Sequence, residues 1–266
     1  MHDAHNHIHS PRLAPWRAAF LAELPSLGLR RAVVNGTSES DWPAVKSLAA
    51  EVPWVLPSYG LHPWFVNERT PAWRETLLAC LDARCGIGEI GLDRWIVGHD
   101  IAAQAECFTW QLALAAERNL PATIHCIRAW GALWEILREH PVPGRGFLLH
   151  AYGGPAEMVQ GFVARGAYFS FSPYFLHERK SAQRAVFAKI PAERLLVETD
   201  APDMAPPTTH NRHPLPDHDG KPLNHPANIV TAYAALAELR GISIESLTDL
   251  IAENFTRLFD NQSVIA

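Results

Sequence analysis

The stretch Arg194-Leu-Leu-Val-Glu-Thr-Asp-Ala-Pro202 shows the pattern that decides the fold. Its first half is an apolar run of the kind that forms a strand buried on both faces in a parallel sheet. Its second half carries Glu198 and Asp200, two carboxylates at the point where that strand would end. An apolar strand that finishes in metal-capable side chains is typical of α/β barrel enzymes, which build their active sites at the carboxyl ends of their strands.

The same pattern recurs along the whole chain. An apolar run, a turn and a helical stretch follow one another repeatedly, and no low-complexity segment or linker interrupts them. The eight expected strands end near His7, Asn35, His62, Glu89, His125, His150, Ser172 and Asp200. Each interval suits a loop, a helix and the next strand, so the sequence predicts an α/β fold, a TIM (β/α)8 barrel that forms a single domain over residues 1–266.

Local signals mark two helices and one long loop. Asp100 is expected to cap a helix from Ile101 to about Arg118, because the following apolar residues recur every three or four positions. Ser243 is expected to cap a last helix that runs to about residue 259. Residues 201–226 hold seven prolines and four histidines and predict a long, stiff loop, whose histidines we interpret as surface residues and not as a further metal site.

Composition narrows the classes of function. Hydrophobic residues make up 48% of the 266 residues, which supports a sizeable core and excludes an intrinsically disordered chain. The net charge of −5 argues against a strongly basic surface for nucleic acid, although it permits a local basic rim. No apolar run suits a membrane span and the first residues lack a signal-peptide pattern, so we expect a cytoplasmic protein without a membrane or an obligate protein partner.

Histidines at the expected strand ends carry the chemical signal. In Asp3-Ala-His5-Asn-His7, the two histidines alternate along a strand, so both point to the same face and can reach one metal ion. His125 and His150 each end an apolar run. One such histidine is more often a core residue than a ligand, but together on neighbouring strand ends they favour metal binding.

Glu89 is the most unusual carboxylate of the sequence. It lies inside the apolar, glycine-flanked stretch Gly88-Glu-Ile-Gly-Leu-Asp93, where burial requires a cation nearby. A bridge between two metals would satisfy both of its oxygens, and an ion pair with Arg94 is the alternative. Asp200 is placed to ligate a metal and to deprotonate a water, so Glu89 and Asp200 are the expected catalytic residues.

Six groups therefore suit two divalent metal ions: His5, His7, Glu89, His125, His150 and Asp200. Imidazole-rich ligation favours Zn, Mn, Fe or Ni over Mg but does not choose among them. Such a pair of metals activates water for the hydrolysis of phosphoesters or amides.

These motifs, in this order, resemble the TatD family of metal-dependent hydrolases. The matching segments are Asp3–His7, Gly60-Leu-His-Pro63, Gly88–Asp93, Ile124-His125, His150-Ala-Tyr-Gly-Gly154, Glu198–Pro202, Asn224-His-Pro226 and Glu253–Phe259. The resemblance implies an amidohydrolase-like barrel with two ligand sets that share Glu89. His5, His7 and Asp200 would complete the first set, and His125 and His150 the second. It also implies that His62 lies either on the substrate side or directly behind the metal ligands, and that the protein is a deoxyribonuclease, often a 3′→5′ exonuclease on single strands.

The residues expected to face the substrate depart from the family pattern. Arg94-Trp95 stand where an aromatic pair is usual, and His125-Cys-Ile-Arg128 replaces the usual His-x-Arg. Arg94 and Arg128 are candidates for binding a phosphate of the substrate, with a structural salt bridge as the equal alternative. Four aromatic residues follow strand ends and either stack on nucleobases or pack in the core: Trp64, Trp95, Trp130 and Tyr152.

Three functions follow from these features. The first is a deoxyribonuclease that cleaves phosphodiester bonds through a dinuclear metal-activated water. The second is a hydrolase of a small phosphoester or amide, which the acidic net charge and the altered substrate-facing residues motivate. The third is a non-catalytic, metal-binding interaction module, which the presence of all six ligands disfavours.

Overall fold

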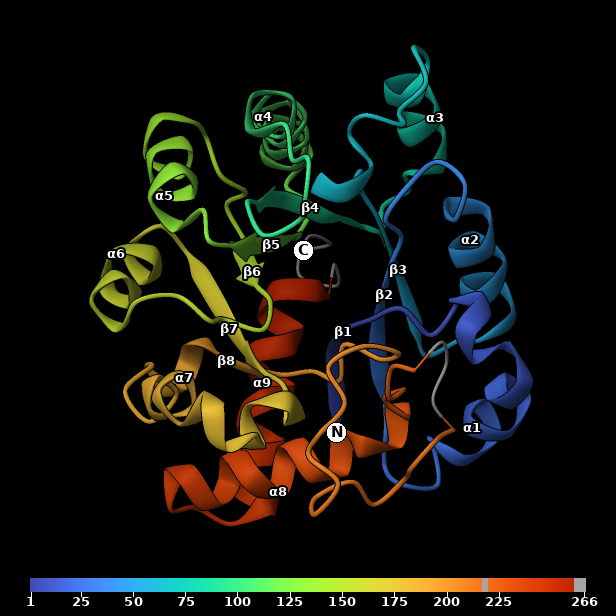
Figure 1. Ribbon diagram of the computed structural model, residues 1–266, viewed down its shortest axis with the longest axis vertical. Coiled ribbons are helices and arrows are strands. Elements are labelled where there is room, and N and C mark those ends of the chain that lie inside the picture. Colours follow the sequence, from blue (N-terminus) through green and yellow to red (C-terminus); the bar gives the residue numbers. More distant parts are fainter. Residues whose placement is uncertain (217–219, 261–266) are drawn as a thin grey trace, which may run out of the picture. The chain divides into compact units, whose positions relative to one another are not determined.

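The eight strands follow one another in chain order in a single sheet (Figure 1). The structure is a computed structural model, and it describes residues 1–216 and 220–260. The strands are β1 (His2–Asn6), β2 (Arg31–Asn35), β3 (Val55–Tyr59), β4 (Gly86–Asp93), β5 (Ala122–Ile127), β6 (Phe147–Leu149), β7 (Ala167–Phe171) and β8 (Leu195–Val197).

A helix follows each strand. The helices are α1 (Arg17–Glu23), α2 (Trp42–Glu51), α3 (Trp73–Cys80), α4 (Ile101–Arg118), α5 (Trp130–Glu139), α6 (Val159–Ala164), α7 (Ser181–Val186), α8 (Ile229–Arg240) and α9 (Ile244–Phe259). This alternation with sequential strand order is that of a (β/α)8 barrel, so the predicted TIM-barrel class is confirmed. Within the described ranges, none of these helices has the length and hydropathy to cross a membrane.

The chain divides into two compact units. Unit 1 consists of Met1–Val34, His150–Tyr152 and Phe169–Thr256, and unit 2 consists of Asn35–Leu149, Gly153–Tyr168 and Arg257–Ala266. Unit 1 thus contains β1, β8 and most of β2 and β7, whereas β3 to β6 belong to unit 2. The organisation as one domain over residues 1–266 stays a prediction.

A glycine allows the close approach of β4 and β5 in unit 2. Gly91 pairs with His125 in the parallel register of these strands and has φ +144°. A Cβ at Gly91 would lie 2.0 Å from the carbonyl oxygen of His125, so no larger residue fits without displacing the backbone. The second glycine of the Gly-Glu-Ile-Gly motif is therefore required by the sheet.

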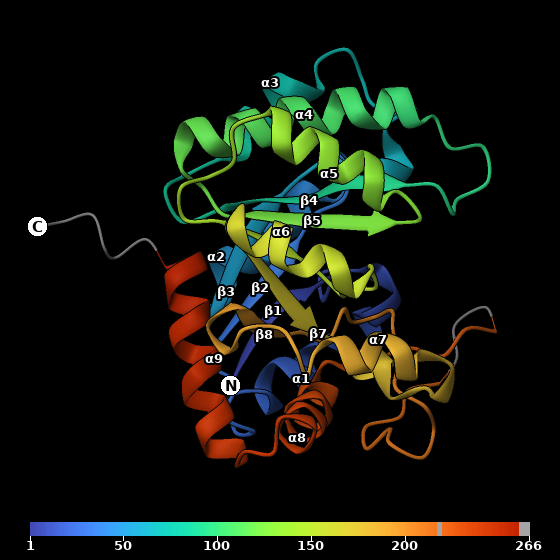
Figure 2. The same cartoon turned by 90° about the vertical axis from the view of Figure 1, so that its left-hand side faces the viewer.

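Two buried glutamines of α4 hold the segment that follows β3 and the last residue of β4. The side chain of Gln111 pairs with both backbone groups of Leu61, at 2.7 Å to the nitrogen and 3.2 Å to the oxygen. Gln104 does the same for Asp93, at 2.8 and 3.0 Å. Figure 2 shows α4 alongside β4 and β5. The glutamines thereby satisfy buried backbone groups beside His62 and at the end of β4.

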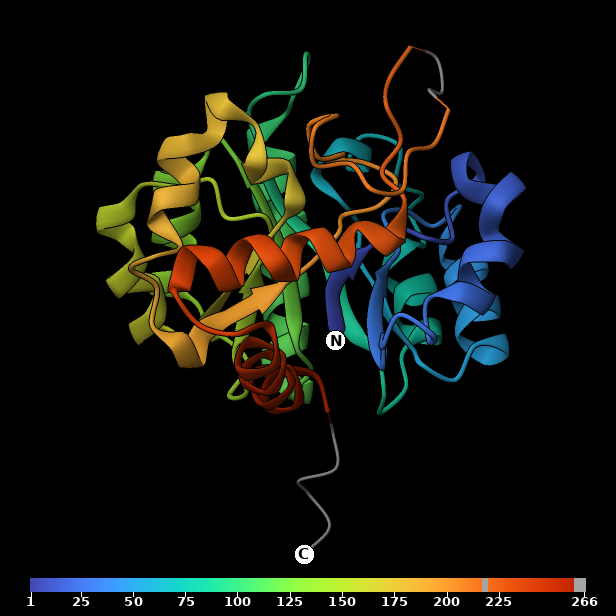
Figure 3. The same ribbon diagram turned by 90° about the horizontal axis from the view of Figure 1, so that it is seen from below.

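In unit 1, the end of β1 lies against the segment that follows β8. The His7 nitrogen donates to the Ala201 oxygen at 2.7 Å, and the Asp200 nitrogen donates to the His5 oxygen at 2.9 Å. Helix α8, visible along its length in Figure 3, packs against β8, and its Tyr233 hydroxyl donates to the backbone oxygen of His2. These contacts fix the backbone that carries His5 and Asp200.

Local predictions agree with the structure where short-range signals act. Asp100 accepts hydrogen bonds from the nitrogens of residues 102 and 103 at the start of α4, which ends at Arg118 as expected. Ser243 caps α9 by accepting from the Ser246 nitrogen at 3.1 Å. Two strands are shorter than expected, because β3 ends at Tyr59 and β8 at Val197. His62 and Asp200 therefore lie in the loops beyond these strands.

Candidate metal-binding active site

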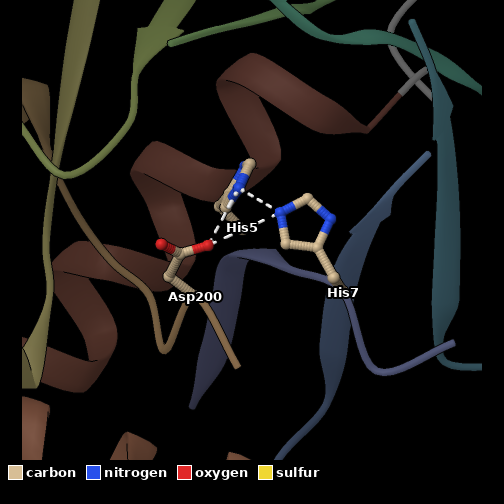
Figure 4. Close-up of side chains that lie close together, drawn as sticks. All are labelled: His5, His7 and Asp200. Atoms are coloured by element: carbon tan, nitrogen blue, oxygen red, sulfur yellow. Dashed lines mark hydrogen bonds and ion pairs between the residues drawn. The ribbon is translucent and has the colours of Figure 1, made fainter. Parts of the chain in front are cut away.

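The first group of candidate ligands lies in unit 1 and consists of His5, His7 and Asp200. The Nε2 atoms of the two histidines are 3.1 Å apart, and Asp200 Oδ1 lies 3.3 Å from His5 Nε2 and 3.5 Å from His7 Nε2 (Figure 4). His5 is fully buried and Asp200 is 7% exposed. The predicted convergence of the histidine pair with Asp200 is present, and one ligand atom from each residue points to a common centre.

The backbone and the charge of Asp200 are both constrained. Its φ of +55° is left-handed, a conformation that is uncommon for residues other than glycine. Two further residues that follow strands share this conformation, namely Arg128 after β5 and Ala151 after β6. Burial alone would raise the pKa of Asp200, but hydrogen bonds from His5 and His7 hold this pKa well below its usual range. Asp200 is thus a carboxylate at neutral pH.

His150 also lies in unit 1, where its ring stacks on that of His5 with centroids 4.0 Å apart and an interplanar angle of 14°. Its Nδ1 is 3.6 Å from Oε1 of the fully buried Glu198. The other oxygen of Glu198 accepts a hydrogen bond from Ser170 Oγ. Among the described residues, Glu198 Oε1 has no hydrogen-bond donor, so this buried carboxylate faces the His150 ring without full compensation.

Asp3 has a structural role that the sequence did not indicate. Its Oδ2 accepts from Thr199 Oγ1 at 2.6 Å, and its Oδ1 accepts from the Thr199 nitrogen at 3.0 Å. Burial raises the pKa of Asp3 to about 7, against the lowering effect of these hydrogen bonds. The pair holds the start of β1 to the residue that precedes Asp200. The only indication of this role in the sequence is the position of Asp3 two residues before His5, which places both side chains on the same face of the strand.

The second group lies in unit 2 and consists of His62, Glu89 and His125. Glu89 Oε1 is 2.9 Å from His125 Nδ1 and 3.3 Å from His62 Nε2, and the three side chains are buried. One ligand atom from each residue converges on a common centre. The structure therefore brings His62 directly to Glu89, and the role of His62 towards the substrate stays a prediction. Arg94 is exposed and makes no ion pair with Glu89, so the alternative partner for this carboxylate is wrong.

Asp93 orients His125 and caps the following segment. Its Oδ2 is 2.9 Å from His125 Nε2, and its Oδ1 accepts from the Trp95 nitrogen at 2.6 Å. Burial opposes ionisation, but the hydrogen bond and the charge of His125 keep the pKa of Asp93 well below its usual range. An ionised Asp93 fixes a proton on His125 Nε2, so Nδ1 is the nitrogen that would bind a cation together with Glu89.

Both groups fit divalent metal ions. Each combines two imidazoles with one carboxylate, in buried positions where an uncompensated carboxylate would be costly. Nitrogen-rich sets of this kind suit Zn, Mn, Fe, Co or Ni better than they suit Mg.

The candidate substrate residues differ in accessibility. Arg94 and Arg128 follow β4 and β5, are exposed, and have no salt bridge within the part of the chain that the structure describes. The four aromatic candidates divide into two pairs. Tyr152 is fully buried against Phe169, and Trp130 packs edge-on to Phe162. Trp64 and Trp95 are 40% and 54% exposed.

A third cluster, Glu23 with His213 and His225, lies at the long loop of unit 1. Its members are only half-buried, and His213 Nδ1 is 3.8 Å from Glu23 Oε1. His225 Nδ1 accepts from the Ala227 nitrogen at 3.0 Å and thereby caps a short 3-10 helix. These contacts give His225 a structural role, whereas the interpretation of the loop histidines as surface residues without a metal stays a prediction, and His218 lies outside the described residues.

The family model of the TatD related DNases matches residues 2–260. The chain belongs to this family. It is 29% identical over 262 residues to the uncharacterized metal-dependent hydrolase YjjV of Escherichia coli (strain K12), with 97% of each chain covered. The crystal structure of YjjV matches this TatD-family fold with a TM-score of 0.87 at 28% identity, covering 98% of both chains.

Two further similarities bear on activity and on fold. The TatD-family chain is 30% identical over 264 residues to the 3'-5' ssDNA/RNA exonuclease TatD of Erwinia tasmaniensis, covering 98% of this chain and 100% of the relative. An uncharacterized amidohydrolase from Saccharomyces cerevisiae shares the fold, with a TM-score of 0.77 at 19% identity over 97% of this chain and 99% of that one. The expectation of a metal-dependent hydrolase of the TatD family with an amidohydrolase-like barrel is confirmed.

Proposed function

We propose that this TatD-family hydrolase is a nuclease that removes nucleotides from the 3′ end of single-stranded DNA or RNA. The observation that carries the proposal is the convergence of His5, His7 and Asp200 on one centre, matched by that of His62, Glu89 and His125 on another. Two metal centres are the usual means of cleaving the phosphodiester bond. The relative named as a single-strand exonuclease supports the choice of substrate.

Each group is proposed to hold one divalent cation. His5, His7 and Asp200 would bind the first cation, and His62, Glu89 and His125 would bind the second. The family resemblance further suggests that Glu89 contacts both cations and that His150 is a ligand. Such cations lower the pKa of a water and stabilise negative charge on phosphate oxygens. We further propose that the protein acts in the cytoplasm.

The side chains of the protein have separate tasks in the proposed reaction. Asp200, ionised at neutral pH, is the group that accepts the proton of the attacking water. Asp93 keeps the His125 ring in one tautomer and one orientation. Arg94 and Arg128 are exposed beyond β4 and β5, where planar guanidinium groups would grip phosphate oxygens of the strand.

The test is nucleotide release from 5′-labelled single-stranded DNA and RNA, with Mn2+, Mg2+, Zn2+ or EDTA present. We expect release only with metal, shortening of the strand from its 3′ end, and a loss of at least about 100-fold in Asp200→Asn, since proton transfer contributes about 10² to 10⁴ in rate. Asp203→Asn is the matched control, because this exposed carboxylate lies three positions away and pairs with Arg12. His150→Ala should also abolish release.

The second candidate is a hydrolase of a small phosphoester or amide. The net charge of −5 favours it, because a basic surface that would track a long strand is not apparent in the composition. Turnover of small esters or amides by metal-loaded protein that leaves every strand intact would decide for this candidate. Metal binding without turnover of any substrate would favour the interaction module.

A further inference from the structure

Two of the nine tryptophans lie open to solvent beside the second ligand group. Trp64 follows β3 and Trp95 follows β4, and their ring centroids are 6.2 Å apart with an interplanar angle of 34°. The other seven tryptophans are buried or half-buried. An exposed pair of large aromatic rings leaves apolar surface in water, which is costly unless a ligand covers it.

Both residues are tied to the same carboxylate. Trp64 donates its indole Nε1–H to Asp93 Oδ2 at 2.7 Å, and the Trp95 backbone nitrogen donates to Asp93 Oδ1 at 2.6 Å. The same Oδ2 atom lies 2.9 Å from His125 Nε2. Asp93 thus couples the position of the exposed rings to that of a candidate metal ligand.

The Trp64 ring is also packed against the ligand histidines. It meets His62 edge-on at 5.2 Å and His125 at 6.4 Å between centroids. Trp64 therefore lies next to the ligand histidines, and Trp95 lies next to Trp64. The Trp64 ring is held by these contacts, so it offers a binding surface at little entropic cost.

We propose that Trp95, supported by Trp64, stacks on a nucleobase of the single-stranded substrate. This inference rests on the proposed nuclease function, since it assigns the base next to the cleaved phosphate to this surface. A nucleobase is the flat aromatic partner that a nuclease substrate offers, and stacking on it is tolerant of sequence. It also suits an acidic protein, because stacking provides affinity that does not depend on phosphate charge.

The surface explains a preference for single strands. Inside a duplex, both faces of a base are covered by its neighbours, so an indole has access only after unstacking. A frayed or single-stranded end presents a free base face. Arg94 is exposed and lies between Asp93 and Trp95 in the sequence. Its guanidinium group would bind the phosphate next to the base that stacks on Trp95.

The experiment pairs removal of the ring with removal of the base. Wild-type protein, Trp95→Ala and Trp95→Phe are titrated into short labelled strands that carry one abasic nucleotide at successive positions from the 3′ end. Equilibrium binding is measured in EDTA, and KM and kcat for release are measured with metal. Val97→Ala is the matched control, because Val97 is 98% exposed and apolar on the same loop but has no ring.

We expect Trp95→Ala to raise Kd and KM about tenfold, as is typical of one lost base–aromatic stack, with kcat largely preserved. Trp95→Phe should retain part of the affinity, and Val97→Ala should match wild type. When the abasic nucleotide occupies the position whose base stacks on Trp95, Trp95→Ala should not raise Kd or KM any further. Equal affinity of wild type and Trp95→Ala for all strands would overturn the stacking assignment, even if release continued. Trp95-dependent binding without release would instead refute the nuclease function and leave the stacking surface.

Discussion

Asp93 Oδ2 lies 2.9 Å from Nε2 of His125, while Nδ1 of the same ring lies 2.9 Å from Glu89. The imidazole is thus held between two carboxylates, one that fixes its proton and one that shares its candidate metal. Only the second carboxylate belongs to the ligand group. The first controls the tautomer and the angle of the ring, and it also caps the segment that carries Trp95.

Replacement of Asp93 by Asn should weaken metal binding. The neutral amide no longer favours a proton on Nε2 of His125, and loss of such a partner typically lowers metal affinity about 10- to 100-fold. Competition with a chromogenic chelator measures this affinity directly. Asp249→Asn, on the exposed face of α9, is the control and should bind metal like wild type. Unchanged affinity in Asp93→Asn would show that His125 is positioned by its packing alone.

Glu198→Gln should also weaken metal binding, through its effect on His150. The buried carboxylate faces His150 Nδ1 at 3.6 Å and is anchored by Ser170, so the variant loses the charge that stabilises a protonated Nδ1. We expect metal affinity to fall about 10-fold or more, with the fold retained. Glu193→Gln, an exposed position just before β8, serves as the control. If calorimetry found the same affinity in both variants, Glu198 would have only a packing role.

Two glycine substitutions should have opposite effects on stability. In Gly91→Ala, the added Cβ would lie 2.0 Å from the His125 oxygen at φ +144°, so we expect a loss of about 3 kcal/mol or more in the free energy of unfolding. Gly131 lies within α5, and a Cβ added there would have no neighbouring atom within 4 Å, so Gly131→Ala should stabilise by about 0.5 to 1 kcal/mol. Urea unfolding measures both values, and a stable Gly91→Ala would contradict the close approach of β4 and β5.

The contribution of His2 to stability should be lost in mild acid, whereas the raised pKa of Asp3 acts in the opposite direction. Burial, aided by the positive N-terminus and Arg31, lowers the pKa of His2 to about 4 from 6.5. The unfolded chain therefore binds a proton between pH 6.5 and 4 that the folded chain rejects, so this stability is complete above pH 6.5 and is lost as the pH falls towards 4. The ring packs at 4.6 Å from Phe255, so His2→Phe keeps an aromatic ring that does not titrate.

The size of the His2 effect is on the order of 1 to 2 kcal/mol, since each pKa unit is worth about 1.4 kcal/mol and partial exposure screens the charges. Unfolding in urea at pH 7.5, 6 and 4.5 should show a smaller loss for His2→Phe than for wild type. Parallel curves for the two proteins would assign the acid sensitivity to other groups.

The sequence predicted what depends on short-range patterns. Buried strands, the Asp100 and Ser243 caps and the end of α4 follow from signals within a few residues, and they agree with the structure. The convergence of His5 and His7 follows from strand alternation. The position of Asp200 beside them needed the rule that barrel enzymes gather their sites at strand ends.

Contacts between residues that are far apart in the sequence could not be predicted from it. Gln111 holds Leu61 fifty residues away, which keeps the loop beyond β3 ordered and lets His62 reach Glu89. The hydrogen bonds between Asp3 and Thr199 join residues that lie 196 positions apart in the sequence. Tyr152 followed a strand end just as Trp95 did, yet it is fully buried, because exposure depends on packing partners such as Phe169 that no local pattern specifies.

The left-handed backbones of Arg128, Ala151 and Asp200 imply a conflict between selection for stability and selection for catalysis. Glycine would relieve a strain on the order of 1 kcal/mol or more at each position. A screen for thermal resistance alone should therefore enrich glycine at residue 151, which has no proposed chemistry of its own. Glycine at residue 200 would also relieve strain, but it would remove the carboxylate that the proposed reaction needs. We therefore expect a lineage that no longer needed the enzyme to lose Asp200 early.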